Sequence, residues 1–421
     1  MDPGSPARLV DVGAGRGVSG KDGRLSAALA RMWGNAIGST LRRLERRRAR
    51  MLPPLDPGTL SPAAQKLAAP TAPEKLQEVA AKGIAPGLRP GEVLSVLLLL
   101  RGSERTTVRE NAERTLGDVP EQLLSGALGT DLPPQVIDVL SVTYRDRVDV
   151  LEKLLAMPRI DAETVVDLAA HCSEQISELI ATNEQRLLAH PRIIEKLYMN
   201  RRTRMSTAGR LVELAARNKV ELLGLPAWKE AVEAIKDELI VEPTGEPTPE
   251  DIAFKQALEL ADELVGLEED THQELEEGGE QLKSKFALLY KKVADMSMSE
   301  KIRTAMLGTR EQRMILVRDR NKLIATAVVR SPLMQESEAA LIARNKNMSV
   351  EVLRIIAGIP ELVKSYGVKR ALVENPKTPI TTAQRLVQHL RENDLKILAK
   401  SKNVTGPVKD AARRHLERRN T

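Results

Sequence analysis

The sequence predicts an all-α protein, a right-handed α-solenoid of short stacked helices arranged in two parts. Apolar residues recur at helical spacing over most of the chain from about residue 61 onward. Short polar or proline-containing turns interrupt this spacing at regular intervals, as in helical repeats. Aromatic residues make up only 2% of the chain and hydrophobic residues 42%. The core therefore consists of aliphatic side chains and Met, which suits layers of helices better than sheets.

Residues 1–60 differ in composition from the rest of the chain. Gly, Arg and Pro are frequent there, and residues 41–50 read Leu-Arg-Arg-Leu-Glu-Arg-Arg-Arg-Ala-Arg. We expect a disordered basic arm with one short helix near residues 25–50, because this segment lacks the apolar surface that offsets the entropy of ordering. A second interpretation stays open, in which translation starts at Met51 and residues 1–50 are not made in vivo.

Residues 61–239 are expected to form an N-terminal helical-repeat domain. Prolines at positions 90 and 133–134 open two of its helices, and Asp161 is the expected N-cap of another. The expected helices lie near residues 76–80, 93–100, 135–142, 148–156, 184–189 and 211–216, and a further helix starts at Asp161.

Residues 240–280 are expected to be an acidic, proline-containing linker. Residues 242–249 contain three prolines and a glycine, and residues 230–280 carry 18 acidic but only 2 basic side chains. The run 268–277 lacks the Asp-x-Asp-x-Asp-Gly framework of a calcium loop, so we expect a solvated, self-repelling segment. Residues 281–421 reverse the balance, with 29 basic and 13 acidic side chains, and form the expected C-terminal basic helical-repeat domain.

Repeat units are clearest in this C-terminal domain. Four segments, which start at Arg330, Asn345, Glu374 and Ser401, share a polar or proline turn, one apolar residue, a capping residue and an amphipathic helix. The N-terminal domain shows the same cadence at residues 157–160, 190–193 and 202–205. One unit is too small to bury its own apolar stripe, so the units must stack.

These units resemble a known family. The stretch Asn375-Pro-Lys-Thr-Pro379, the Leu/Val-rich helix after it and Leu398-Ala-Lys-Ser-Lys-Asn-Val404 are similar to the leucine-rich-repeat-variant units of bacteria, a HEAT-like class. The resemblance implies a superhelix of alternating α- and short 3₁₀-type helices. Residues 297–415 also resemble an uncharacterised bacterial family of helical-repeat proteins. The iron–sulfur centre of some variant-repeat proteins is not implied, because Cys172 is the only cysteine in this sequence.

The sequence predicts no enzyme and no cofactor. Residues 15–20 fit the GxGxxG pattern, but no alternating βα pattern follows them. Cys172 is expected to be a small core residue, because adjacent positions on a helix do not face each other and His171 therefore cannot activate it. The histidines share no metal-ligand spacing; they are His171, His190, His272, His389 and His415. No apolar stretch is long enough for a membrane span, and we expect a cytoplasmic protein.

Clusters of Lys and Arg are the candidate binding residues for an anion or a partner. They are Arg201, Arg202, Arg204, Arg318, Arg320, Lys322, Lys364, Lys369, Arg370, Lys400 and Lys402. The first functional hypothesis is a scaffold or adaptor that binds a protein partner, and the alternative is duplex nucleic-acid binding through the basic repeats. The scarcity of aromatic side chains argues against single-strand recognition. An exposed apolar groove would favour the protein partner, and a ladder of cations would favour the duplex.

The opposite charges of neighbouring segments suggest a regulatory hypothesis. The acidic residues 230–280 adjoin the basic residues 281–421, so each is at high effective concentration near the other. The acidic segment is hypothesised to lie across the basic repeats and to compete with anionic ligands. The alternative is that the two segments are solvated independently.

Overall fold

The computed structural model describes residues 52–236, 238, 245–268 and 279–420. These residues form 25 α-helices and one 3₁₀ helix, and no strand occurs among them. The all-α class predicted from the sequence is therefore confirmed.

Three of the helices up to residue 235 begin with the signals that the sequence predicted. Pro90 and Pro134 open α4 and α7, where a missing backbone N–H leaves no helical bond unmade. The Asp161 carboxylate caps α9 by accepting from the Glu163 N–H at 2.9 Å, as expected. In order, the helices are η1 (Pro57–Thr59), α2 (Pro62–Ala68), α3 (Glu74–Ala81), α4 (Pro90–Leu100), α5 (Thr106–Gly117), α6 (Glu121–Leu128), α7 (Pro134–Thr143), α8 (Val148–Ala156), α9 (Ala162–His171), α10 (Glu174–Ala181), α11 (Glu184–Ala189), α12 (Arg192–Tyr198), α13 (Met205–Arg217) and α14 (Trp228–Ile235).

The remaining helices are short, apart from α15, α16 and α26. Ser297 and Ser349 cap α17 and α21 through their hydroxyl groups. In order, the helices are α15 (Pro249–Glu268), α16 (Gly279–Asp295), α17 (Met298–Leu307), α18 (Arg310–Leu316), α19 (Lys322–Arg330), α20 (Glu336–Arg344), α21 (Val350–Gly358), α22 (Pro360–Lys364), α23 (Tyr366–Glu374), α24 (Ile380–Val387), α25 (Glu392–Lys400) and α26 (Gly406–Asn420).

Helices that are separated by one or two intervening helices pack side by side, which arranges the chain in two rows. In one row α4 packs on α7, α7 on α9, α9 on α12, α17 on α19, α19 on α21 and α24 on α26. In the other row α6 packs on α8, α8 on α10, α10 on α13, α16 on α18 and α20 on α23. We call these the first and second rows. A continuous aliphatic core lies between them.

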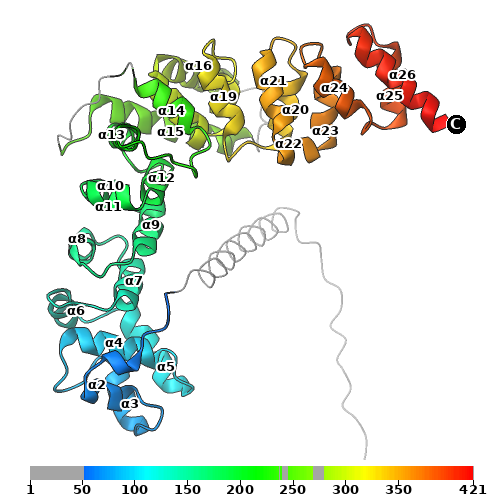
Figure 1. Cartoon of the computed structure of the whole chain (residues 1–421). Helices are drawn as coiled ribbons and strands as arrows, with labels where there is room; N and C mark the ends of the chain where they lie inside the picture. The colour runs from blue at the N-terminus through cyan, green and yellow to red at the C-terminus, as the bar shows by residue number, and fades with distance from the viewer. Residues whose placement is uncertain (1–51, 237, 239–244, 269–278, 421) are drawn as a thin grey trace, which may run out of the picture.

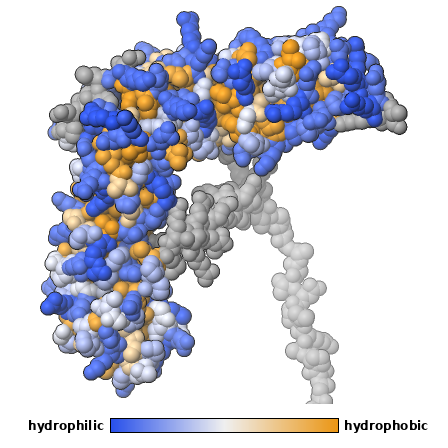
Figure 2. Space-filling model, viewed as in Figure 1, coloured by the Kyte–Doolittle hydropathy of each residue, from blue (hydrophilic) through white to orange (hydrophobic). Residues whose placement is uncertain are grey.

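The molecule is elongated and bent, as Figure 1 shows. Helices α2–α12 form a column, which we call the first arm, and α14–α26 extend from its end in a different direction as the second arm. Helix α13 lies at the bend. Figure 2 shows apolar side chains on the surface of both arms, with a patch over the middle of the second arm.

One buried arginine joins the two arms at the bend. Arg303 of α17 has no exposed surface, and its guanidinium donates to the carbonyl oxygens of Tyr198, Asn200, Thr203 and Arg204 at 2.9–3.1 Å. These carbonyls belong to the C-terminal end of α12 and the turn after it. Burial lowers the pKa of Arg303 to about 10, so the side chain stays protonated at neutral pH. Arg303 thereby fixes α17 beside α12 and continues the first row across the bend.

A buried ion pair positions the second row beyond the bend. Arg313 of α18 donates to both carboxylate oxygens of Glu338 in α20, at 2.7 and 2.9 Å. Its third nitrogen donates to the Gly308 carbonyl at 2.7 Å. The guanidinium group therefore has a partner for each nitrogen, which is what a buried charge requires.

Packing begins earlier than the boundary expected at residue 61. Residues 1–51, which include the expected helix near 25–50, lie outside the described part of the chain. Leu55 is buried, and the Gln135 side chain donates to the Pro53 carbonyl at 2.8 Å. The last residues assigned to the disordered arm are thus part of the packed structure, because Leu55 has an apolar surface to cover.

The expected linker contains a packed helix. Helix α15 lies within residues 240–280 and buries Phe254, Leu258 and Leu264. The Asp251 carboxylate accepts from the Ser206 N–H at 2.8 Å and from the Thr248 N–H at 2.9 Å, so α15 is fixed to the start of α13. The apolar stripe, repeated every three or four residues, overrides the acidic composition that suggested a solvated segment.

Candidate partner-binding edge

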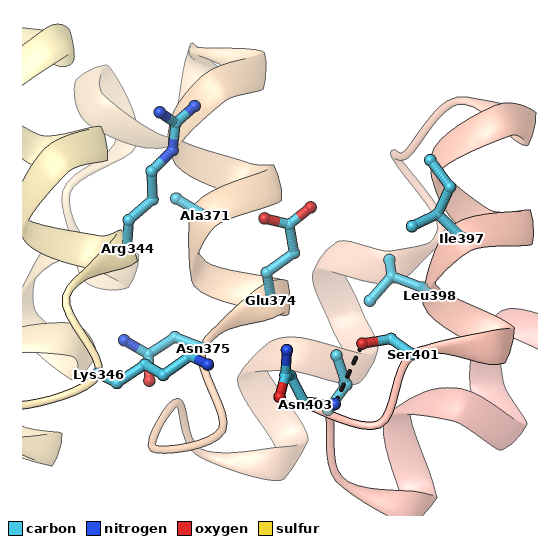
Figure 3. A pocket seen from close by; sticks show the side chains of 10 residues that line it. Arg344, Lys346, Ala371, Glu374, Asn375, Ile397, Leu398, Ser401 and Asn403 are labelled. Carbon is cyan, nitrogen blue, oxygen red and sulfur yellow. Dashed lines mark hydrogen bonds between the residues drawn. The ribbon is translucent and has the colours of Figure 1, made fainter.

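Four turns of the second arm follow α18, α20, α23 and α25 and lead to α19, α21, α24 and α26. We call them the return turns; they comprise residues 317–321, 345–349, 375–379 and 401–405. Because each makes the same kind of connection, they lie along one edge of the arm. Figure 3 shows the last three meeting around one groove.

In the last three return turns, the side chain of the first residue fixes the backbone of the turn. The Asn345 and Asn375 amide oxygens accept from the N–H groups two residues ahead at 2.9 Å, and the Ser401 hydroxyl accepts likewise at 3.2 Å. The fourth residue of each turn is buried, namely Met348, Thr378 or Val404. The repeat pattern seen in the sequence therefore has a structural origin: the first residue shapes the turn and the fourth anchors it.

Asn375 also closes the gap between neighbouring second-row helices. Its amide nitrogen donates to the carbonyls of Ala343 and Asn345, at 2.7 and 3.1 Å, at the end of α20. Asn200 does the same in the first row, where it donates to Ala169 and Cys172 at 3.1 Å. A buried Asn at the end of a helix thus bridges to the equivalent helix of the preceding unit.

Ser401 occupies the equivalent position after α25 and carries no amide to make this bridge. A groove of about 240 Å³ opens here between α23 and α25. At their other ends the two helices are tied together, because Asp394 accepts from the Tyr366 hydroxyl and pairs with Arg370 at 3.2 Å. The groove is therefore wedge-shaped, closed near residue 394 and open at the return turns.

The groove has apolar walls and a basic rim. Ile397 and Leu398 extend from α25 toward it, and Ala371 of α23 faces them (Figure 3). The Ile397 side chain is 58% exposed, which is unusual for a large aliphatic residue. Arg344 and Lys346 lie on the rim. The groove thus combines an exposed apolar surface with positive charge.

Several predicted basic residues have structural partners instead of a free charge. Arg201 donates to both oxygens of Asp262, at 2.9 and 3.0 Å. Arg204 pairs with Glu174 at 2.8 Å, and Arg370 with Glu374 at 2.7 Å. The half-buried Lys369 donates to the Lys364 carbonyl at 3.4 Å. These residues hold helices together, and sequence clustering alone could not separate them from available cations.

The other predicted residues are exposed and have no carboxylate within ion-pair distance in the described residues; they are Arg202, Arg318, Arg320, Lys322, Lys364, Lys400 and Lys402. The structure brings Lys400 and Lys402 close to the groove but places Arg202 at the bend. It adds three exposed cations that the sequence did not indicate, namely Arg344 at the end of α20 and Lys346 and Lys377 on the return turns. The repeat pattern in the sequence could have identified these three cations, because each lies within two residues of the Asn that begins a return turn.

The corresponding turns of the first arm carry cations that are paired. Arg159, in the turn between α8 and α9, pairs with Asp131 at 3.4 Å. Arg192, at the start of α12, pairs with Glu163. Equivalent positions thus differ between the arms: these two first-arm cations are paired, whereas Lys346, Lys377 and Lys402 on the return turns of the second arm are in no ion pair among the described residues.

Two acidic residues of α15 form ion pairs. Asp262 pairs with Arg201, and Glu263 with Lys285 at 3.2 Å. Residues 237, 239–244 and 269–278 lie outside the described residues, and with them most of the 268–277 run and His272. The hypothesis that this segment covers the basic repeats therefore stays a prediction.

Cys172 is a packed thiol. It is buried, and the Asn200 amide nitrogen lies 3.4 Å from its sulfur. Burial raises the pKa of the Cys172 thiol to about 12. The sulfur is therefore protonated and unreactive at neutral pH, as expected of a core residue. The GxGxxG segment at residues 15–20 lies outside the described part of the chain.

Within the ranges that the structure describes, no cluster of three or more His, Cys, Asp or Glu side chains could hold a metal ion. None of the helices described is both long and apolar enough to cross a bilayer. No family model, curated protein or solved structure matches the chain. The resemblance to leucine-rich-repeat-variant units therefore stays a prediction.

Proposed function

We propose that this chain is a non-catalytic scaffold that binds a protein partner along the return turns and groove of its second arm. The proposal includes the right-handed α-solenoid expected from the sequence, and the two rows of packed helices support that part. One observation carries the binding role: unpaired cations lie beside an exposed apolar groove in the second arm, whereas the equivalent cations of the first arm are ion-paired.

A protein partner fits this combination of groups. Specific protein interfaces place apolar and aromatic side chains at the centre and polar groups at the rim. Ile397 and Leu398 supply the apolar part here, and Arg344 and Lys346 supply the rim. Positive charge over residues 281–421 also speeds association with an acidic partner.

Affinity capture from the native cell tests the proposal. The full chain and a variant with Arg344→Glu, Lys346→Glu and Lys402→Glu are compared, each with and without nuclease treatment of the extract. We expect a protein that is retained after nuclease and lost with the variant. Retention of the same proteins by both forms would contradict binding at this edge.

Duplex nucleic acid is the second candidate, and the series of exposed cations on successive return turns favours it. Such contacts release counterions, so affinity falls steeply with salt. Titration of a 20-base-pair duplex at low and moderate salt tests this role. A steep salt dependence that disappears in the triple variant supports it, and no binding at low salt excludes it. In either case we propose a cytoplasmic location.

A further inference from the structure

We propose that the groove between α23 and α25 binds an acidic peptide segment of the partner and takes up one aliphatic side chain of that segment. This inference rests on the proposed scaffold function and names the chemistry of the partner. It is carried by the size of the groove, the closure of the neighbouring gap, and the charges around the rim.

The size of the groove fits one side chain. Its volume of about 240 Å³ is below the range of about 300–1,000 Å³ that is usual for small-molecule pockets. Ile397, Leu398 and Ala371 form apolar walls, beside the charged side chains of Arg344, Lys346 and Glu374 that also line the groove. An aliphatic side chain fits these walls, because it buries Ile397 without leaving a polar group unpaired.

The groove is held open by the fold. Asn375 closes the neighbouring gap between α20 and α23 with two hydrogen bonds, and Ser401 cannot repeat this between α23 and α25. The contacts of Asp394 with Tyr366 and Arg370 fix the closed end of the wedge. The site is thus preorganised, so little ordering is needed when a peptide enters.

The charges around the groove select an acidic segment. Arg344, Lys346, Lys400 and Lys402 are exposed, and no carboxylate within the described ranges pairs with them. Glu374, the carboxylate on the rim, is already paired with Arg370 at 2.7 Å. The uncompensated charge beside the apolar walls is therefore positive, which favours Asp and Glu on either side of the aliphatic residue.

The occupant is a separate molecule. The chain's own acidic run, residues 268–277, connects α15 to α16, and these two helices pack on each other at the start of the second arm. Ten residues anchored at both ends reach outward by roughly 18 Å at most, at about 3.5 Å per residue. Helix α25 lies near the far end of the second arm in Figure 1.

A random dodecapeptide display library, panned on the full chain, tests the inference. We expect enriched peptides to carry several Asp or Glu residues around one Leu, Ile or Met. The strongest peptide is then synthesised, together with versions in which the aliphatic residue is Ser or the acids are amides. Each change is expected to weaken binding by about tenfold or more. Enrichment of neutral or basic peptides, or no enrichment, would overturn the inference.

Matched variants locate the binding. Ile397→Glu is compared with Ile84→Glu, because Ile84 is 57% exposed on the first arm. Lys402→Glu is compared with Lys82→Glu, which changes an exposed lysine at the end of α3. We expect the second-arm variants to weaken the peptide at least about tenfold and the first-arm variants less than about twofold. Equal effects of the matched pairs would overturn the assignment to this groove.

Two further measurements separate the possible failures. If Ile397→Glu leaves partner capture from extracts intact while the triple cation variant abolishes it, the scaffold function stands and the peptide groove is wrong. If a 20-base-pair duplex binds with a dependence on Lys402 but not on Ile397, and acidic peptides do not compete, the edge binds nucleic acid and both proposals fail. Competition between the acidic peptide and the captured protein supports both.

Discussion

At the scale of single residues, Arg303 has the largest structural role at the bend. Its guanidinium satisfies carbonyl groups that are about 100 positions earlier in the chain. The sequence predicted a basic helical-repeat domain around Arg303 but gave no sign of this role, because a buried arginine without a carboxylate partner looks like any exposed arginine in a basic segment. Only its hydrogen bonds to the end of α12 and the turn after it identify this role.

Replacing Arg303 with Met is expected to lower the free energy of unfolding by about 3 kcal/mol or more, because several buried carbonyls lose their hydrogen-bond donor. Arg303→Lys is also expected to lower the free energy of unfolding. An ammonium group has three N–H donors on one nitrogen and cannot donate to all four carbonyls that the planar guanidinium group binds. Chemical denaturation monitored by circular dichroism measures both. The control is Arg310→Met on the exposed face of α18. A loss below about 1 kcal/mol for Arg303→Met would contradict the account of the bend.

Cys172 gives a prediction about reactivity and pH. Alkylation by iodoacetamide requires the thiolate, and burial raises the pKa of Cys172 to about 12. In the unfolded chain this pKa returns to about 8.5. At pH 8 we therefore expect labelling of the native protein to be at least about 100-fold slower than labelling in urea, as measured by mass spectrometry. Similar rates in both states would show that the thiol is accessible in the native fold.

At the scale of helices and turns, a buried Asn after a helix decides whether neighbouring helices are bridged. The turns after residues 344, 374 and 400 were predicted from the sequence as parts of repeats. The different roles of Asn375 and Ser401 were not, because both residues are common in turns and only the folded chain shows that the Asn375 amide bridges two helices. The same reasoning missed α5, whose buried stripe is only Val108, Ala112 and Leu116 within a highly charged segment.

Asn375→Ser is expected to lower the free energy of unfolding by about 1–3 kcal/mol. Serine keeps the acceptor that shapes the turn, as Ser401 does, but it removes the donor to Ala343 and Asn345. Urea denaturation gives the value, and Asn347→Ser, at an exposed position in the preceding turn, is the control. If the two variants are equally stable, the amide bridge does not hold α20 and α23 together.

The docking of α15 is expected to depend on pH through Asp251. Burial acts to raise the pKa of this carboxyl, but hydrogen bonds from Ser206 and Thr248 outweigh it and hold the pKa below its ordinary value of 3.8. The unfolded chain therefore binds a proton first as the pH falls. The stabilisation by Asp251 is present above pH 3.8 and is lost as the pH drops through the lower folded value.

Asp251→Asn tests this dependence. The variant is expected to be less stable than the wild type at pH 7 by about 1–3 kcal/mol, and the difference should shrink below pH 4. Thermal melts between pH 3 and 7 measure it, with Asp295→Asn at an exposed position as the control. A difference that is constant over this range would show that Asp251 does not contribute through its charge.

At the scale of the whole molecule, the all-α class and the repetition of short helices followed from apolar spacing and turn residues. The bend did not, because it depends on Arg303 and on a helix inside the segment whose acidic composition predicted a linker. The position of the binding edge followed only in part. Lys400 and Lys402 were predicted, whereas Arg201 and Arg204 have ion-pair partners that only the folded chain brings near them.

Truncation separates the packed start of the chain from the residues before it. Removal of residues 1–50 is expected to leave the melting temperature of the rest unchanged, because their Gly- and Arg-rich composition offers little apolar surface to bury. Removal of residues 1–60 also deletes Leu55 and the Pro53 carbonyl that Gln135 binds, and it should lower the melting temperature by several degrees. A large drop with the shorter deletion would show that residues 1–50 pack on the fold.

The central claim is that the partner binds at the return turns of the second arm. Hydrogen–deuterium exchange of the full chain, with and without the captured partner, tests it directly. We expect new protection in residues 344–348, 371–378 and 397–404, which line the groove and its turns, and little change in the equivalent first-arm turns around Arg159 and Arg192. Protection confined to the first arm, or spread evenly over both arms, would contradict the account.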